Sequence, residues 1–303
     1  CMIQINTIAT SIGSVFTSFN PDMSGSALNT LYLIIGIIGA VLTVLVLFGG
    51  MRRIGNVTER LVPIMAAVYV ISALIVVLTH LGSVGPVFVS IFKGAFDPSA
   101  ISGGLAGVAI QQAVKYGFGR GIFSNEAGLG TAPIAHAAAD VDHPVHQAMY
   151  GVFEVFTDTI IICTLTALAI LVSGHAVNFY GSAAGTDLTI LAFSTTLGSK
   201  AASLIVAICI MMFAYSTLLS WSLYGARCLE FLIGAKGIVI YQAVYTACMI
   251  IGAVVKLDLI WEISDSFNAL MAIPNLIAVL ALSPTVVRLT REYFADPENA
   301  RDD

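Results

Sequence analysis

Charged residues are scarce in this sequence. Asp, Glu, Lys and Arg together make up 10% of the 303 residues, whereas about 25% is usual in a soluble globular protein. Hydrophobic residues make up 58%, and such a chain has too few polar residues to cover a surface that faces water. We therefore expect an integral membrane protein, and the composition excludes a soluble cytosolic or secreted one.

Basic runs, cysteine pairs and enzyme motifs are also missing. The 13 Lys and Arg residues and 18 Asp and Glu residues give a net charge of −5 without a basic run, which excludes a nucleic-acid partner. The five cysteines form no Cys-x-x-Cys pair, so we expect small apolar residues rather than disulfides or a zinc site. Because HExxH, Walker A and GxSxG motifs are absent, neither an enzyme nor an organic cofactor is predicted.

What the sequence does contain is a series of long apolar runs. A helix needs about 20 apolar residues to cross a hydrocarbon core of ~30 Å. The semi-polar stretch 1–19 and the glycine-rich stretch 99–139 are predicted to add two crossings, giving about eight in an all-α fold. Two shorter stretches, 84–96 and 186–199, are predicted to form short surface helices. The long runs are 28–50, 61–82, 147–173, 201–226, 237–255 and 260–283.

Lys and Arg predict the orientation, because they accumulate in cytoplasmic loops. If the loop 51–60 is cytoplasmic, the loops 140–146 and 227–236 and the C-terminal tail share its side, provided that 99–139 crosses once. We predict a multi-pass protein of the cell (inner) membrane, with a transmembrane core at 1–288 and a cytoplasmic tail at 289–303. The cytoplasmic side then has Arg52, Arg53, Arg60, Arg227, Lys236, Arg288, Arg291 and Arg301, and the opposite side has Lys93, Lys200 and Lys256.

The stretch 117–136 is unusual for a membrane segment because it is rich in glycine and polar residues. It reads GFGRGIFSNEAGLGTAPIAH, and each glycine destabilises a continuous helix by about 1 kcal/mol relative to alanine. Arg120, Asn125 and Glu126 cannot face lipid, and irregular backbone at membrane depth is tolerated only inside protein or beside a cavity. Tight packing of a glycine-rich helix would not explain the polar residues.

We therefore predict a broken helix here. One half would end before Gly117, an unwound linker would contain Ser124 and Asn125, and a second half would run through Pro133 and His136. Freed amides at such a break attract a carboxylate, and freed carbonyls coordinate a cation. Arg120 and Glu126 are predicted to brace the linker against each other.

Two motifs carry a family resemblance. The sequences GRGIFSNEAGLGTAPIAHAAA at 119–139 and STLLSWSLYGARCLEF at 216–231 resemble those of the alanine or glycine:cation symporters. The resemblance implies symport of alanine or glycine with Na⁺ as the co-transported ion, by alternating access. It also implies an inverted-repeat, leucine-transporter-like core of ten helices, here N-terminally truncated. Residues 1–19 would then be the third core helix and 260–283 the tenth.

The same resemblance implies site residues outside the glycine-rich stretch. Thr217 and Trp221 share a helix face at i, i+4 spacing and would border the substrate, and Ser216 and Thr217 would hold sodium. The alternative is that the hydroxyls bond back to their own helix and the indole only packs. Gln4, near Asn6, would reach the substrate. The full set of predicted substrate residues is Gln4, Gly121, Ser124, Asn125, Thr217 and Trp221.

Acidic residues leave further alternatives open. Glu154 and Asp158 have i, i+4 spacing in the run 147–173 and are predicted either to act as cation ligands or gates or to make structural hydrogen bonds. Asp265, at the start of the last run, would gate the outer mouth or simply be solvated. A proton-coupled carrier using Glu126, Glu154 or Asp158, and an amino-acid sensor that binds without flux, are the competing functions.

Overall fold

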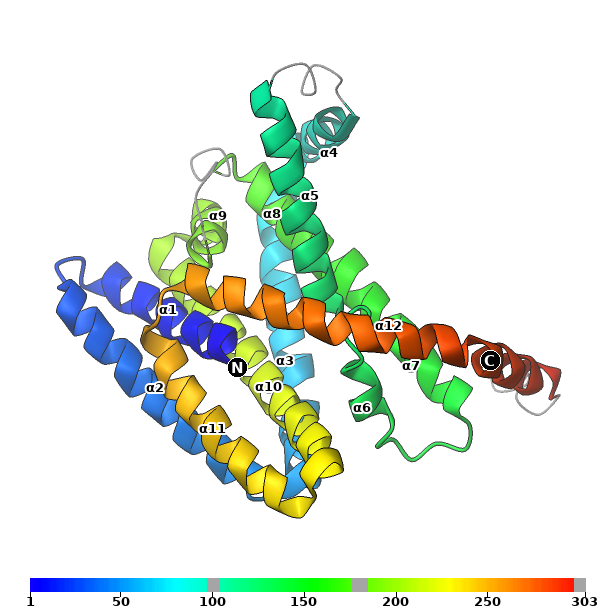
Figure 1. Ribbon diagram of the computed structural model, residues 1–303. Helices are drawn as coiled ribbons and strands as arrows, with labels where there is room; N and C mark the ends of the chain where they lie inside the picture. Colours follow the sequence, from blue (N-terminus) through cyan, green and yellow to red (C-terminus); the bar gives the residue numbers. More distant parts are fainter. Residues whose placement is uncertain (97–103, 176–184, 297–303) are drawn as a thin grey trace. The chain divides into compact units, whose positions relative to one another are not determined.

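The computed structural model describes residues 1–96, 104–175 and 185–296, and these residues form helices and no strand (Figure 1). The chain divides into two compact units. Unit 1 is Cys1–Asp97 with Cys163–Trp261, and unit 2 is Pro98–Ile162 with Glu262–Asp303. The all-α class is confirmed, whereas the ten-helix inverted-repeat core and the division at residue 288 stay predictions.

Unit 1 is built around the 35-residue helix α10, which packs against α1, α3, α9 and α11. Figure 1 shows α1, α2, α10 and α11 lying side by side. The helices of unit 1 are α1 (Met2–Phe19), α2 (Gly25–Leu47), α3 (Gly50–Thr79), α4 (Leu81–Phe96), α8 (Thr164–Val172), α9 (Asp187–Leu197), α10 (Ser199–Ile233) and α11 (Ala235–Val254).

Unit 2 contains the glycine-rich stretch and the end of the chain. Its helices are α5 (Gly104–Asn125), α6 (Ala132–His136), α7 (Pro144–Phe156), most of the π-helix η2 (Thr157–Cys163) and most of α12 (Leu257–Ala295). His143 begins α7 by accepting a hydrogen bond from the amide of Val145 at 3.2 Å, and Pro144 follows at the first helical position, where its missing N–H is harmless.

Six helical segments among the described residues are long and apolar enough to cross a bilayer. They confirm the six long apolar runs and make this a multi-pass membrane protein. The stretches 84–96 and 186–199 form the short helices α4 and α9, as predicted. The further crossings at 1–19 and 99–139 stay predictions. The six segments are Gly25–Leu47, Arg53–Thr79, Pro144–Val172, Ser199–Ile233, Ala235–Val254 and Leu257–Ala295.

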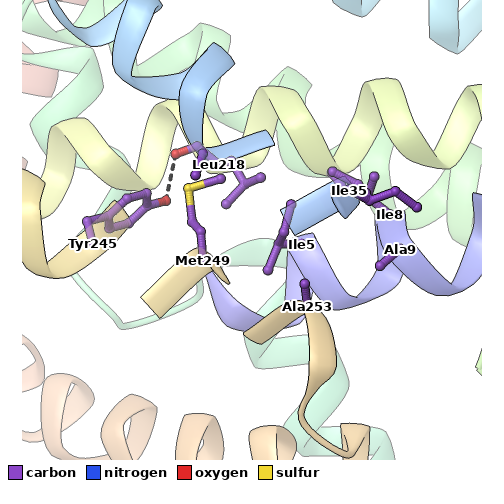
Figure 2. Close-up of a cluster of buried hydrophobic side chains, with 10 residues drawn as sticks. Ile5, Ile8, Ala9, Ile35, Leu218, Tyr245, Met249 and Ala253 are labelled. Atoms are coloured by element: carbon purple, nitrogen blue, oxygen red, sulfur yellow. Dashed lines mark hydrogen bonds between the residues drawn. The ribbon is translucent and has the colours of Figure 1, made fainter. Parts of the chain in front are cut away.

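The core of unit 1 lies where α1, α2, α10 and α11 meet (Figure 2). Ile5, Leu218 and Met249 are fully buried there, and the Tyr245 hydroxyl donates a hydrogen bond of 2.7 Å to the carbonyl of Leu218. The helices approach closely because a small residue stands at the contact. A Cβ at Gly252 would lie 2.8 Å from the Cα of Met2, so a larger residue would force α1 and α11 apart.

Asn6 joins the same two helices through its amide. Its Nδ2 donates to the carbonyls of Gly252 at 2.9 Å and Val255 at 2.8 Å. The last carbonyls of a helix have no intrahelical donor, so the buried amide of Asn6 caps the C-terminus of α11.

Candidate functional site

The predicted helix break exists, but it lies later in the chain than the sequence suggested. Helix α5 continues through Gly117 and Gly121 and ends at Asn125, so the prediction of a break before Gly117 is wrong. Internal glycines weaken a helix without removing its hydrogen bonds. The chain leaves the helix where φ turns positive, at Glu126 (50°), Gly128 (75°) and Gly130 (78°), a conformation that glycine adopts readily and other residues rarely.

Side chains of the segment itself and of α12 hold the unwound segment Glu126–Thr131. The Thr131 hydroxyl donates to the Glu126 carboxylate across the segment, and Asn275 of α12 donates from Nδ2 to the carbonyl of Gly128 at 3.0 Å. A Cβ at Gly130 would lie 2.7 Å from the Asn275 Oδ1. Within the described part of the chain, the amides of Gly128, Gly130 and Thr131 have no hydrogen-bond acceptor.

Ser124 and Asn125 lie in the last turn of α5 rather than in the unwound linker, which corrects the prediction. The Ser124 hydroxyl donates to Asp158 Oδ2 at 2.6 Å. Asn125 accepts through Oδ1 from the Thr159 hydroxyl at 2.7 Å and donates through Nδ2 to the carbonyl of Gly121 at 3.1 Å. Both predicted ligand residues therefore form hydrogen bonds to side chains of a second helix.

That second helix contains the π-helix η2, which the sequence analysis missed. The run 147–173 was predicted as one regular helix, but residues Thr157–Cys163 adopt π geometry between α7 and α8. π-Helices are rare and recur at functional sites. No composition signal marks this one, because the run is apolar and regular in sequence on both sides of it.

Several charged residues of unit 2 have partners that the sequence analysis did not name. Arg120 donates to Asp265 Oδ2 at 2.6 Å, and its predicted contact with Glu126 stays a prediction. Glu154 Oε2 lies 3.4 Å from His136 Nε2, and Gln147 Nε2 lies 2.8 Å from His136 Nδ1. Glu154 and Asp158 therefore have separate partners although they are four residues apart. Sequence spacing could not reveal these partners, because Arg120 and Asp265 are 145 residues apart.

In unit 1, the predicted sodium residues bond to their own helix. The hydroxyls of Ser216 and Thr217 both donate to the carbonyl of Phe213, at 2.8 Å and 3.0 Å. Donation leaves the lone pairs of these oxygens as acceptors, and the sodium assignment stays a prediction. Trp221 is half-buried and packs edge-to-face on Tyr224 with ring centroids 5.9 Å apart.

Gln4 lies at the same end of the α1–α10 pair as Thr217. Ser18 and Ser203 share a hydrogen bond of 3.0 Å at the other end, and Ile5 packs in one cluster with Leu218, so the two helices run in opposite directions. Gln4 is 8% exposed, and its Oε1 has no hydrogen-bond partner among the described residues. A buried amide oxygen without a donor carries a free-energy cost unless something else supplies one.

Comparison with known proteins decides the family. The model of the sodium:alanine symporter family matches residues 1–303. The chain belongs to the sodium:alanine symporter family. This family consists of transporters and not of enzymes.

Several curated relatives match nearly all of this chain. The sodium/alanine symporter AgcS of Methanococcus maripaludis is 41% identical over 293 residues, which is 96% of this chain and 61% of AgcS. A probable sodium/glutamine symporter, GlnT of Bacillus subtilis, is 35% identical over 97% of this chain and 61% of GlnT. The amino-acid carrier protein AlsT of the same organism is 33% identical over 97% and 63%. The chain thus spans about three fifths of the length of these relatives.

The predicted site residues of this chain fall into two sets. Gln4, Ser216, Thr217 and Trp221 belong to unit 1. The remaining residues belong to unit 2, where the hydrogen bonds given above connect α5 to η2 and to α12. The unit 2 set is Arg120, Gly121, Ser124, Asn125, Glu126, Glu154 and Asp158.

Proposed function

We propose that the full-length protein is a sodium-coupled symporter of a small neutral amino acid, alanine or glycine, that works by alternating access. The observation that carries the proposal is the interruption between α5 and α6, where the amides of Gly128, Gly130 and Thr131 have no hydrogen-bond acceptor among the described residues. Amide dipoles at a broken helix favour a carboxylate. Cell-membrane location and a cytoplasmic C-terminus are part of the proposal.

The predicted substrate residues have chemistry suited to parts of an amino acid, taken for each unit by itself. In unit 2, Gly121, Ser124 and Asn125 are the proposed substrate contacts next to the break. In unit 1, Gln4 offers a buried amide and Trp221 offers an apolar wall that suits a methyl side chain. Ser216 and Thr217 offer hydroxyl oxygens, which are suitable hard ligands for Na⁺.

Coupling then follows from differential affinity. An ion or substrate shifts the equilibrium between inward-open and outward-open states only if it binds one state more tightly. We infer that Na⁺ binding orders the region of the helix break and that the substrate carboxylate then binds to the ordered amides. Arg120, Glu126, Glu154 and Asp158 hold the surrounding helices in this scheme.

Uptake by the full-length protein in proteoliposomes tests the proposal. Radiolabelled alanine and glycine should accumulate when Na⁺ is higher outside than inside and should not accumulate when K⁺ replaces Na⁺. A Thr217→Val substitution should reduce the apparent Na⁺ affinity by about tenfold or more, because it removes one hydroxyl ligand. Uptake that is the same in Na⁺ and K⁺ would contradict sodium coupling.

A proton-coupled carrier is the second candidate, and the pair formed by Glu154 and His136 favours it. The 3.4 Å separation of these two titratable groups lets a proton change the attraction between α6 and α7. Uptake driven by an inward pH gradient without Na⁺, and abolished by Glu154→Gln, would support this alternative. Specific alanine binding without uptake under any gradient would instead support a sensor.

A further inference from the structure

Two consecutive residues at the end of α5 contact two consecutive residues of η2. Ser124 Oγ is 2.6 Å from Asp158 Oδ2, and Asn125 Oδ1 is 2.7 Å from Thr159 Oγ1. All four residues belong to unit 2. Directly after them the chain leaves the helix at Glu126, so the contacts fix the orientation of the last side chains before the break.

The contact at Ser124 has a defined direction. The Ser124 hydroxyl donates its single proton to Asp158 Oδ2. The side chain of Ser124 is exposed, and what its oxygen still offers is lone pairs. Ser124 therefore presents an acceptor to its surroundings.

The contact at Asn125 has the opposite direction. The carbonyl of Gly121 accepts from Asn125 Nδ2 at 3.1 Å, and a carbonyl cannot donate, so this bond fixes which end of the amide is nitrogen. Oδ1 then faces the Thr159 hydroxyl, which donates. Within the described part of the chain the second N–H of Asn125 has no acceptor, so Asn125 presents a donor.

The two contacts on η2 come from its π-helical turn. Consecutive side chains of an α-helix diverge by about 100°, and the wider i→i+5 turn of η2 reduces that divergence. The matched spacing, 34 residues in each contact, shows that neighbours on η2 bind neighbours on α5.

We propose that Asp158 and Thr159 are positioning residues that fix the hydrogen-bond polarity of the site at the end of α5. Ser124 is held as an acceptor for a cationic group, and Asn125 is held as a donor to a carboxylate. This inference rests on the proposed function, because an amino-acid zwitterion carries both groups. The cationic group is either the substrate ammonium or the co-transported Na⁺, which share this chemistry.

Equilibrium binding to the purified full-length protein tests the polarity without requiring flux. Alanine is compared with lactate, which has a hydroxyl in place of the ammonium, and with alaninamide, which lacks the carboxylate, over a range of Na⁺ concentrations. The wild type should bind alanine more tightly than either analogue. Asp158→Leu removes the acceptor for the Ser124 proton, whereas Asp158→Asn retains an acceptor oxygen.

The expected results distinguish the two cationic groups. If Ser124 accepts from the ammonium, Asp158→Leu should lower the alanine-to-lactate affinity ratio by about tenfold or more, and Asp158→Asn should lower it less. If Ser124 binds Na⁺ instead, Asp158→Leu should raise the half-saturating Na⁺ concentration by a similar factor and leave the alanine-to-lactate affinity ratio unchanged.

Thr159 tests the donor half of the proposal. Thr159→Val removes the hydroxyl at nearly constant shape and should lower the alanine-to-alaninamide ratio, and Thr159→Ser should restore it. Thr157→Val is the matched control, because Thr157 lies in the same π-helix but donates to the carbonyl of Phe153 in its own helix, at 2.9 Å. The control should leave both ratios unchanged.

Unchanged ratios and unchanged Na⁺ half-saturation in Asp158→Leu and Thr159→Val would overturn the inference, provided that both variants melt as cooperatively as the wild type. If Asp158→Leu does not fold, the Thr159→Val and Thr159→Ser pair decides alone. Wild-type uptake without sodium dependence would instead overturn the proposed function, and the binding ratios would still decide the polarity.

Discussion

At the scale of single residues, the role of a polar side chain inside this membrane protein depends on the groups to which it forms hydrogen bonds. Asn6 serves two carbonyls of α11, and Asn275 serves the carbonyl of Gly128. The sequence predicted that Gln4 and Asn6 would both line the core, but only the structure separates their roles. Gln4 has an amide oxygen with no partner among the described residues, whereas Asn6 Nδ2 donates to two carbonyls at a helix end. Residue type alone cannot make this distinction.

The capping role of Asn6 predicts a stability effect. Asn6→Leu keeps the size of the side chain but leaves the carbonyls of Gly252 and Val255 without their donor, which should destabilise the protein by about 1–3 kcal/mol. The measurement is the melting temperature of the purified full-length protein in detergent. Thr10→Val is the control, because the Thr10 hydroxyl donates only to carbonyls of its own helix, at 3.0 Å and 3.2 Å. Equal melting temperatures for Asn6→Leu and the wild type would contradict the capping role.

At the scale of elements, the sequence was reliable for long apolar helices and less so for their irregularities. The six long runs became six candidate spans. A helix that crosses lipid needs an uninterrupted run of apolar residues, and such a run is easy to recognise in a sequence. The break after α5 was predicted from glycine content and placed too early. Its position depends on φ at Glu126, Gly128 and Gly130 and on Asn275 from a distant helix, and neither is encoded locally. The π-helix was missed for the same reason.

The ion pair between α5 and α12 gives a prediction at this scale. Arg120→Asp and Asp265→Arg should each reduce alanine uptake by about tenfold or more, because each leaves two like charges in contact. The double variant Arg120→Asp with Asp265→Arg should regain part of the activity, since it restores an attractive pair. Initial uptake rates in proteoliposomes, corrected for the amount of inserted protein, provide the measurement.

The matched control for this pair is Arg227 with Glu230, which are 2.6 Å apart on α10 alone. Reversing these two charges changes no contact between helices and should leave uptake nearly unchanged. If the double variant at Arg120 and Asp265 were no more active than the single variants, the two residues would not act as a pair.

At the scale of the whole molecule, orientation rests on the distribution of basic residues. The assignment requires an odd number of crossings between residues 99 and 139, although α5 is not among the six candidate spans. Helix α5 contains Arg120 and several glycines, so its composition differs from that of a lipid-facing helix. The physical reason for a crossing is therefore charge asymmetry in the loops rather than hydropathy of the segment.

Cysteine accessibility in intact cells tests this orientation directly. In the full-length protein with its native cysteines replaced by serine, Asp142→Cys places a thiol in the exposed loop before α7, and Lys256→Cys places one in the exposed turn between α11 and α12. In the predicted topology Asp142 lies on the side with most of the Lys and Arg residues, which is the cytoplasmic side, and Lys256 lies on the opposite side. A membrane-impermeant maleimide should therefore label Lys256→Cys from outside and Asp142→Cys only after permeabilisation. Labelling of both from outside would require an even number of crossings between residues 143 and 255 and would overturn the predicted topology. Labelling of Asp142→Cys alone from outside would keep the fold but reverse its orientation, which would contradict the positive-inside argument for this chain.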